Sequence, residues 1–344
     1  MIKIGSLPLS KMFVGSAEII KVILNGVTLY EKTPAFLSCL TFSSPSSFTL
    51  KTANTAKNWN GTLEYSTDES TWNVWDGTAI SSGANNSILL RGMGNTYITN
   101  ATSSGKQFVF TGSNISCNGN IMTLLDYQNP SLTVSSQAFS YLFRDCTNLT
   151  TAPQLPATTL ASSCYANMFR GCTSLTAAPE LPATTLGTYC YSAMFQGCTS
   201  LTIIPSLPAT ALANNCYSFM FSGCSKIKLS TTQTGDYTNE YRIPAIGTGT
   251  SATNALNSMF SGTGGSFTGT PTINTTYYTS NTIVPAKAQP ISYFANNIII
   301  LDTPYIQSGS EVALTGVGTY ATSQQNTIIT DTPYSQSGSE VTIL

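Results

Sequence analysis

Histidine is missing from this 344-residue chain, and charged residues of either sign are scarce. Only 8% of the residues are Asp, Glu, Lys or Arg, roughly a third of the usual share, and the net charge is −1. Without histidine the chain lacks the commonest general base and the commonest metal ligand. It also has no basic patch that would follow a phosphate backbone, so the sequence predicts no nucleic-acid partner.

Long apolar segments and catalytic motifs are missing as well. No run of about 18 apolar residues is present, so the sequence predicts no membrane span. Gly5, Lys11, Gly15 and Lys21 interrupt the first residues, which predicts that no signal peptide is present. No Cys-x-x-Cys pair, phosphate-binding loop or nucleophile elbow occurs, so we expect no enzyme, no cofactor and no metal. A glycosidase whose two carboxylates come from distant positions is the alternative that this pattern leaves open.

A 26-residue unit recurs between Ala138 and Gly223. Repetition at a fixed period of this length predicts a solenoid, in which each unit buries its apolar face against the next. The columns in register are Phe143, Phe169, Phe195 and Phe221; Cys146, Cys172, Cys198 and Cys224; Cys164, Cys190 and Cys216; and Leu149, Leu175, Leu201 and Ile227.

Each unit contains two apolar patterns. Cys190, Met194 and Cys198 follow each other at i, i+4 and i+8, which predicts a short helix with an apolar stripe. The apolar pair at 203–204 predicts a short buried strand, which Pro205 ends because proline lacks a ladder donor.

Seven of the nine cysteines lie in the repeat. Cys164 and Cys172 are eight residues apart, too far along one helical stretch to form a disulfide. We interpret the periodic cysteines as free core thiols, with disulfides between adjacent units or a metal site as the less favoured alternatives.

The repeat resembles the BspA-like leucine-rich repeat family. The motif is C-Y-x-x-M-F-x-G-C-T-S-L-T-x-x-P-x-L-P-A-T-T-L, at Cys164–Leu186 and, with small changes, at Cys190–Leu212. A degenerate copy stands at Leu142–Cys146, and a last Met-Phe-Ser-Gly stands at Met259–Gly262. Members of this family occur on bacterial surfaces and in virions of tailed phages. The resemblance therefore implies binding and adhesion and no chemistry.

The fold class predicted is mostly β with short helices, in four parts. An N-terminal β-hairpin module, which would dock onto a virion, is expected in residues 1–33, although an ordinary β-meander would look the same. A β-sandwich-like domain is expected in residues 34–128, a leucine-rich-repeat solenoid with a C-terminal cap in 129–284, and β repeats with a step of 29 residues in 285–344.

The segment 34–128 alternates short apolar runs with turn residues, as in a sandwich. Its three tryptophans, Trp59, Trp72 and Trp75, fit a core, whereas an exposed pair would be suited to stacking on a sugar. The expected strands are Leu40–Phe42, Phe48–Leu50, Thr62–Tyr65, Trp72–Trp75, Ser87–Arg91, Tyr97–Thr99, Phe108–Phe110 and Ile121–Leu125.

The segment that follows the repeats carries an unusual group of charges. Asp236, Glu240 and Arg242 lie in an insertion before the last Met-Phe-Ser-Gly. A terminal repeat must shield the core from water, so a salt-bridged cap is the favoured interpretation. A binding loop is the alternative.

We therefore expect a non-enzymatic phage virion protein, a fibre or a head or tail appendage, that mediates adhesion to the bacterial surface. The expected partners are other virion proteins and a bacterial surface glycan or protein. Trimerisation is expected only by analogy with phage fibres. The alternatives are a bacterial cell-surface adhesin and a purely structural capsid decoration protein.

The recognition surface is expected on the repeats. The tyrosine column would present hydroxyl groups to a ligand, although its i, i+4 match to the phenylalanine column favours packing. Variable polar residues beside the glycines complete the expected site. The candidate binding residues are Tyr165, Tyr191, Tyr217, Arg170 and Gln196.

Overall fold

The computed structural model describes residues 39–53, 59–99 and 107–284 in full, and elsewhere the backbone of strands within 3–31 and 298–343. The chain divides into two compact units. The terminal unit combines residues 1–37 with 292–344, and the central unit comprises residues 38–291.

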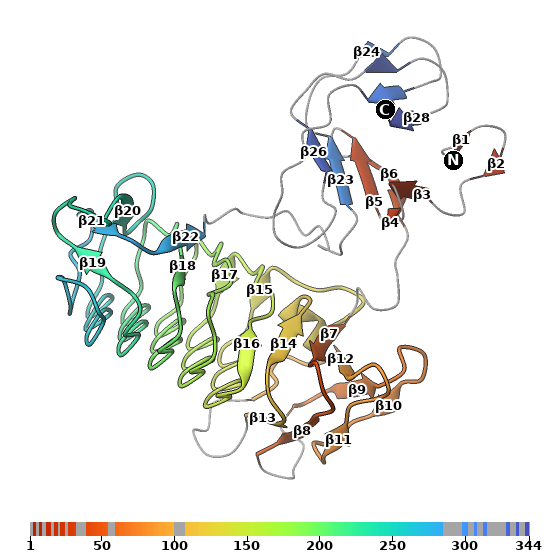
Figure 1. The fold of residues 1–344 in the computed structure, drawn as a ribbon, viewed down its shortest axis with the longest axis horizontal. Helices are drawn as coiled ribbons and strands as arrows, with labels where there is room; N and C mark the ends of the chain where they lie inside the picture. The colour runs from red at the N-terminus through yellow and green to blue at the C-terminus, as the bar shows by residue number, and fades with distance from the viewer. Residues whose placement is uncertain are drawn as a thin grey trace. The chain divides into compact units, whose positions relative to one another are not determined.

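Strands dominate both units, which confirms the mostly-β fold class (Figure 1). In the central unit they are β7 (Leu40–Ser43), β8 (Thr49–Thr52), β9 (Thr62–Ser66), β10 (Asn73–Val74), β11 (Ile80–Ser81), β12 (Ser87–Met93), β13 (Phe108–Thr111), β14 (Ile115–Asn118), β15 (Thr133–Val134), β16 (Leu149–Thr151), β17 (Thr159–Leu160), β18 (Ile203–Pro205), β19 (Leu229–Ser230), β20 (Asn239–Arg242), β21 (Thr276–Thr279) and β22 (Thr282–Val284). Within the fully described residues the one helix is the 3-10 helix η2, Ile121–Leu124.

Two sheets form the first part of the central unit. One has the order β10-β9-β12-β7-β14-β16, and the other has the order β11-β8-β13. The middle strand β12 reads SILLRGM and is buried over most of its length. Trp59 and Trp75 stack on each other inside this core, with ring centroids 5.3 Å apart, so the core interpretation of this pair holds. Two expected strands are wrong: Tyr97–Thr99 is not a strand, and Ile121–Leu125 begins as η2.

The repeats form a stack of coils beside these sheets (Figure 1). Tyr165, Asn167, Phe169 and Gly171 each donate their N–H to a carbonyl 25 residues further on, at 2.8–3.0 Å. The residues between them donate instead to the carbonyl three positions back in the same coil. Each backbone N–H of this stretch therefore either joins two coils or closes a turn.

The short helices expected in the repeats are wrong. Every fourth residue has a positive φ, such as Ser163 at 55°, Asn167 at 57° and Gly171 at 77°, and a right-handed helix does not contain that conformation. The stretch is a series of tight turns with a period of four residues. That period produces the same i, i+4, i+8 apolar spacing as an α-helix.

Both ends of the stack are covered. At the first coil, β16 joins the six-stranded sheet by pairing in parallel with β14. At the last coil, Tyr241 of β20 meets the ring of Phe260 edge-on, with centroids 5.9 Å apart. This residue belongs to the sheet β19-β21-β20, in which β19 and β20 precede Met259 and β21 follows it.

The cap is not held by the expected salt bridge to Arg242. The guanidinium of Arg242 donates to the backbone carbonyls of Pro244 (3.0 Å), Gly247 (2.5 Å) and Asn274 (3.4 Å). These acceptors are all backbone groups of the cap loops. Arg242 therefore ties the loops together by satisfying carbonyls, and neither Asp236 nor Glu240 is among its hydrogen-bond partners.

In the terminal unit, strands from the two ends of the chain pair. Strand β23 runs parallel to β5 on one side and to β26 on the other. Residues of β23 lie opposite residues 29 positions later in β26, so the tail repeats are in register. The sequence assigns the two ends to separate domains, whereas the β5–β23 ladder joins them. The strands are β1 (Lys3–Ile4), β2 (Leu7–Pro8), β3 (Met12–Val14), β4 (Ala17–Ile19), β5 (Lys21–Leu24), β6 (Val27–Glu31), β23 (Ile298–Leu301), β24 (Ile306–Gln307), β25 (Val312–Leu314), β26 (Ile328–Thr330), β27 (Ser335–Gln336) and β28 (Val341–Ile343).

Candidate binding surface on the coil stack

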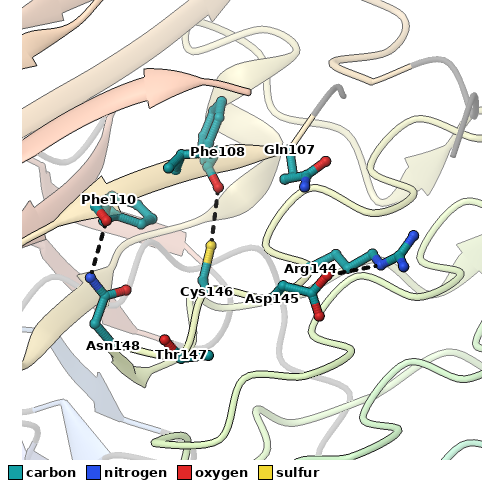
Figure 2. Close-up of a pocket in the computed structure, with 9 residues that line it drawn as sticks. Gln107, Phe108, Phe110, Arg144, Asp145, Cys146, Thr147 and Asn148 are labelled. Carbon is teal, nitrogen blue, oxygen red and sulfur yellow. Dashed lines mark hydrogen bonds and ion pairs between the residues drawn. The ribbon is translucent and has the colours of Figure 1, made fainter. Parts of the chain in front are cut away.

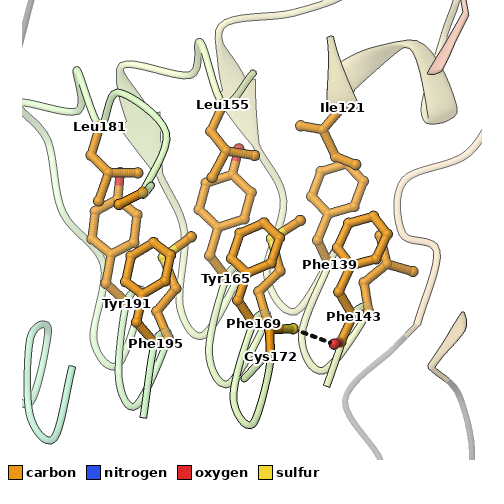
Figure 3. Close-up of a cluster of buried hydrophobic side chains, with 14 of the residues drawn as sticks. Ile121, Phe139, Phe143, Leu155, Tyr165, Phe169, Cys172, Leu181, Tyr191 and Phe195 are labelled. Carbon is orange, nitrogen blue, oxygen red and sulfur yellow. Dashed lines mark hydrogen bonds between the residues drawn. The ribbon is translucent and has the colours of Figure 1, made fainter. Parts of the chain in front are cut away.

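The tyrosine column lies inside the coils. Tyr165, Tyr191 and Tyr217 are at most 1% exposed, and their rings stack with centroids 5.8 Å apart. Figure 3 shows the rings of Tyr165 and Tyr191 inside the coils. Burial raises the pKa of each phenol well above its ordinary value. The hypothesis that these hydroxyl groups are offered to a ligand is therefore wrong, and the packing alternative is correct.

Three hydroxyl groups in this column are poorly satisfied. The Tyr165 hydroxyl reaches only the Sδ atom of Met122, at 4.0 Å. The hydroxyls of Tyr191 and Tyr217 are buried without a hydrogen-bond partner. A buried polar group without a partner destabilises the folded state. These hydroxyl groups therefore affect the stability of the protein and do not form a ligand site.

The cysteines are also internal. All nine are free and buried, in agreement with their interpretation as core thiols. One column has a regular hydrogen bond: Cys146, Cys172, Cys198 and Cys224 each donate from Sγ to a phenylalanine carbonyl of the preceding layer, at 3.0–3.1 Å. These thiols therefore connect neighbouring layers of the stack.

The outward surface of the turns is called the ridge here. It consists of the positive-φ positions Gln137, Tyr141, Ser163, Asn167, Tyr189, Ala193, Asn215 and Phe219, of which Ala193 is buried at 7% exposure. Two of them are large and exposed: Tyr189 at 45% and Phe219 at 38%. None of the ridge residues is charged.

Arg170 and Gln196 lie beside the ridge and are partly exposed. The guanidinium of Arg170 approaches the Oδ1 atom of Asn167 at 3.5 Å, which places it next to a ridge amide. The structure thus keeps these two expected residues at the surface and removes the three tyrosines. The exposure of Tyr189 was not expected from the sequence, because its neighbours in the column, Ser163 and Asn215, are polar and the position shows no aromatic pattern.

A small hollow of about 120 Å³ lies where β13 meets the first coil (Figure 2). Ligand pockets usually measure a few hundred Å³ or more. Several of its lining groups are already engaged: Arg144 pairs with Asp145 at 3.2 Å, and the Cys146 thiol and the Asn148 amide donate to carbonyls of β13. The hollow is therefore best described as a seam between the two parts of the unit.

A second polar cluster lies on the six-stranded sheet. Arg91 is sandwiched between the rings of Trp72 (3.9 Å) and Tyr127 (4.5 Å), and its Nε donates to Glu64 at 2.7 Å. This arrangement could not be predicted from the sequence, because the four residues come from separate segments. The cluster links β9 and β12 with the segments that precede β10 and follow η2.

The carboxylates Asp68 and Asp76 serve their own turns. Asp68 Oδ1 accepts the N–H groups of Ser70 (3.0 Å) and Thr71 (2.7 Å), and the Thr71 bond is the main cause of the lowered pKa of Asp68. Hydrogen bonds from Thr78 lower the pKa of Asp76 in the same way. These two groups are ionised turn-formers, the reverse of a general acid with a raised pKa.

The part of the chain that the structure describes contains no cluster of His, Cys, Asp or Glu suited to a metal ion. It also contains no helix long and apolar enough to cross a membrane. Comparisons of this chain with protein-family models, with curated proteins and with solved structures found no match.

Proposed function

We propose that this chain is a non-enzymatic adhesion protein of the phage virion appendage type, which binds the surface of a bacterium. The observation that carries the proposal is the division of each repeat into a constant interior and a changing exterior. The interior columns keep Phe, Cys and Leu or Ile through the coils, whereas the ridge changes from Ser and Asn to Tyr, Ala and Phe. Packing between coils explains why the interior residues stay the same, and recognition of a ligand would explain why the ridge residues change.

Further support comes from the resemblance to BspA-like repeats and from the character of the surface. The exposed positions of the coils are mainly Thr, Ser and Asn, and charge is scarce throughout the chain. Such a surface offers hydroxyl and amide groups for hydrogen bonds and lacks paired carboxylates with the properties of a general acid and its partner. Binding therefore fits the described residues better than chemistry does.

The test uses the purified full chain with a fluorescent label and a panel of bacterial species. Saturable binding to at least one species, together with an oligomer mass from light scattering, would support an adhesive appendage. Binding to phage particles but to no bacterium would replace the proposal by a capsid decoration protein. Detection of the chain on the surface of the bacterium that encodes it would replace it by a cellular adhesin.

A further inference from the structure

Two exposed aromatic residues on the ridge are unexplained by folding. Tyr189 has φ 59° and Phe219 has φ 58°, a left-handed conformation that bulky residues rarely adopt. The equivalent position in the coil after Tyr189 holds Asn215, and the one two coils before Phe219 holds Asn167; asparagine tolerates this conformation well. Neither backbone preference nor burial accounts for the aromatic choice, and such departures are concentrated at functional sites.

The coil lattice fixes where these two side chains stand. Ala193 follows Tyr189 by one turn of four residues in the same coil. It also bonds directly to the next coil, where its N–H donates to the Ser218 carbonyl at 2.8 Å, immediately before Phe219. The small Ala193 side chain therefore lies between Tyr189 on its own coil and Phe219 on the neighbour. Asn167 occupies the same column on the other side.

We call this group of residues the notch: Ala193, which is 7% exposed, lies between two exposed aromatic side chains, and polar groups lie nearby. Asn167 and Ser192 contribute an amide and a hydroxyl, and Arg170 adjoins Asn167. Ser192 Oγ lies within hydrogen-bonding distance of Ser218 Oγ, at 3.2 Å. Aromatic faces pack against the C–H groups of a sugar ring, while amides and hydroxyls bond its hydroxyl groups.

We propose that this notch binds a sugar ring of a neutral glycan, a proposal that rests on the adhesive function given above and names its ligand class. The ridge residues themselves are uncharged, and Arg170 beside Asn167 can donate hydrogen bonds to neutral hydroxyl groups, which matches an uncharged ligand. A protein partner would need roughly 800 Å² of complementary surface. Beyond the two aromatics the ridge of the second to fourth coils carries only short polar side chains and one alanine.

The test replaces the aromatics by the residue that the chain itself uses at the same positions. Tyr189→Asn and Phe219→Asn place asparagine in a conformation that it favours, so both variants are expected to fold at least as well as the parent. Ile246→Asn, at a side chain 82% exposed in the cap loops, is the matched control. Each full-length variant is measured on bacterial cells and on an array of neutral oligosaccharides.

The expected result is at least a tenfold loss of affinity in the double variant on both supports, no change in the control, and loss of cell binding after periodate oxidation of the cells. Unchanged binding by the double variant would overturn the notch while leaving adhesion intact. Cell binding that protease abolishes and periodate spares would overturn the glycan and indicate a protein receptor. If the parent protein binds no cell, the adhesive function is overturned and the oligosaccharide array alone tests the notch. The notch is then overturned as well if the parent binds no neutral oligosaccharide, or if the double variant binds it equally.

Discussion

The thiol of Cys172 donates a hydrogen bond to the backbone carbonyl of Phe143 in the preceding coil, at 3.0 Å. The same carbonyl accepts the N–H of Cys146 at 3.1 Å. The relationship recurs one coil later between Cys198 and Phe169. A periodic cysteine thus adds a bond between coils at a carbonyl that the turn alone would leave with one partner.

This bond predicts a difference between two substitutions of nearly equal volume. Cys198→Ala and Cys198→Ser both remove the sulfur, but serine keeps a hydrogen-bond donor. We expect the free energy of unfolding of Cys198→Ser to be about 1 kcal/mol higher than that of Cys198→Ala, so the serine variant is the more stable of the two. Urea denaturation followed by tryptophan fluorescence or circular dichroism measures the difference. Equal stabilities would mean that the thiol acts only as an apolar filler.

Burial of the thiols also predicts a loss of stability at alkaline pH. Burial raises the pKa of Cys164 from 9.0 to about 12 and that of Cys216 from 9.0 to about 11. Well below pH 9 these thiols are protonated in the folded and the unfolded state, so they do not make the free energy of unfolding depend on pH. Between about pH 9 and the native pKa of each thiol, the unfolded chain has released the proton and the folded chain has not, so the free energy of unfolding falls by about 1.4 kcal/mol per pH unit for each thiol.

The measurement is a series of denaturation curves between pH 8 and 11. Cys164→Ala removes one titrating thiol, so its stability is expected to fall less steeply with pH than that of the parent. A parallel slope in the two proteins would contradict the prediction. A thiol reagent offers a second readout: at pH 8 it should label the native chain slowly and all nine cysteines after denaturation.

The sequence was sufficient to predict that equivalent residues of the repeats lie in columns. The rings of Phe143 and Phe169 stack with centroids 5.4 Å apart, as expected for residues one period apart. It was not sufficient to distinguish a helix from tight turns, because Cys190 and Met194 fit a period of 3.6 or of 4 residues. Asn167 and Gly171, four apart and both tolerant of positive φ, carried the missing signal.

The candidate site was harder to predict for a related reason. In a helix, Tyr165 would have lain at the edge of the apolar stripe, partly open to solvent. In the four-residue turns it faces inward with Phe169, and the outward position passes to the positive-φ residues. A wrong local conformation thus shifted the expected surface positions by two residues, from the tyrosine column to the ridge.

The unsatisfied phenols predict that removing a hydroxyl stabilises the protein. Tyr191→Phe and Tyr217→Phe keep the stacked rings and eliminate a buried polar atom without a partner. Phe139 already occupies the equivalent place in the first coil and stacks on Tyr165 at 5.8 Å. We expect each change to raise the free energy of unfolding by about 1 kcal/mol and to leave binding unchanged.

Tyr241→Phe is the matched control for those two variants. Its buried hydroxyl donates to the Pro205 carbonyl at 3.3 Å, so its removal should destabilise the protein by about 1 kcal/mol. Thermal unfolding of the three variants therefore separates a satisfied phenol from unsatisfied ones. A fall in stability in all three would show that Tyr191 and Tyr217 have partners, such as buried water.

The seam between β13 and the first coil predicts a special role for Asn148. Its Nδ2 atom donates to the carbonyls of Phe110 (3.3 Å) and Gly112 (2.9 Å), on the edge of β13 that faces away from β8. The equivalent residues of the next coils are Ser174 and Ser200, which face another coil. Asn148 therefore allows the first coil to pack against strand β13, where the later coils pack against another coil.

Replacing Asn148 by serine gives the first coil the residue of its successors and removes both bonds, because the shorter side chain does not reach β13. We expect a loss of about 1–2 kcal/mol and faster amide exchange at the first coil and the end of β13. Ser174→Ala is the control, since position 174 is the same place in a coil stacked on a coil. Exchange that rises equally in both variants would assign the effect to the repeat itself. Exchange confined to Asn148→Ser would show that the contacts at the seam hold the stack of coils against β13.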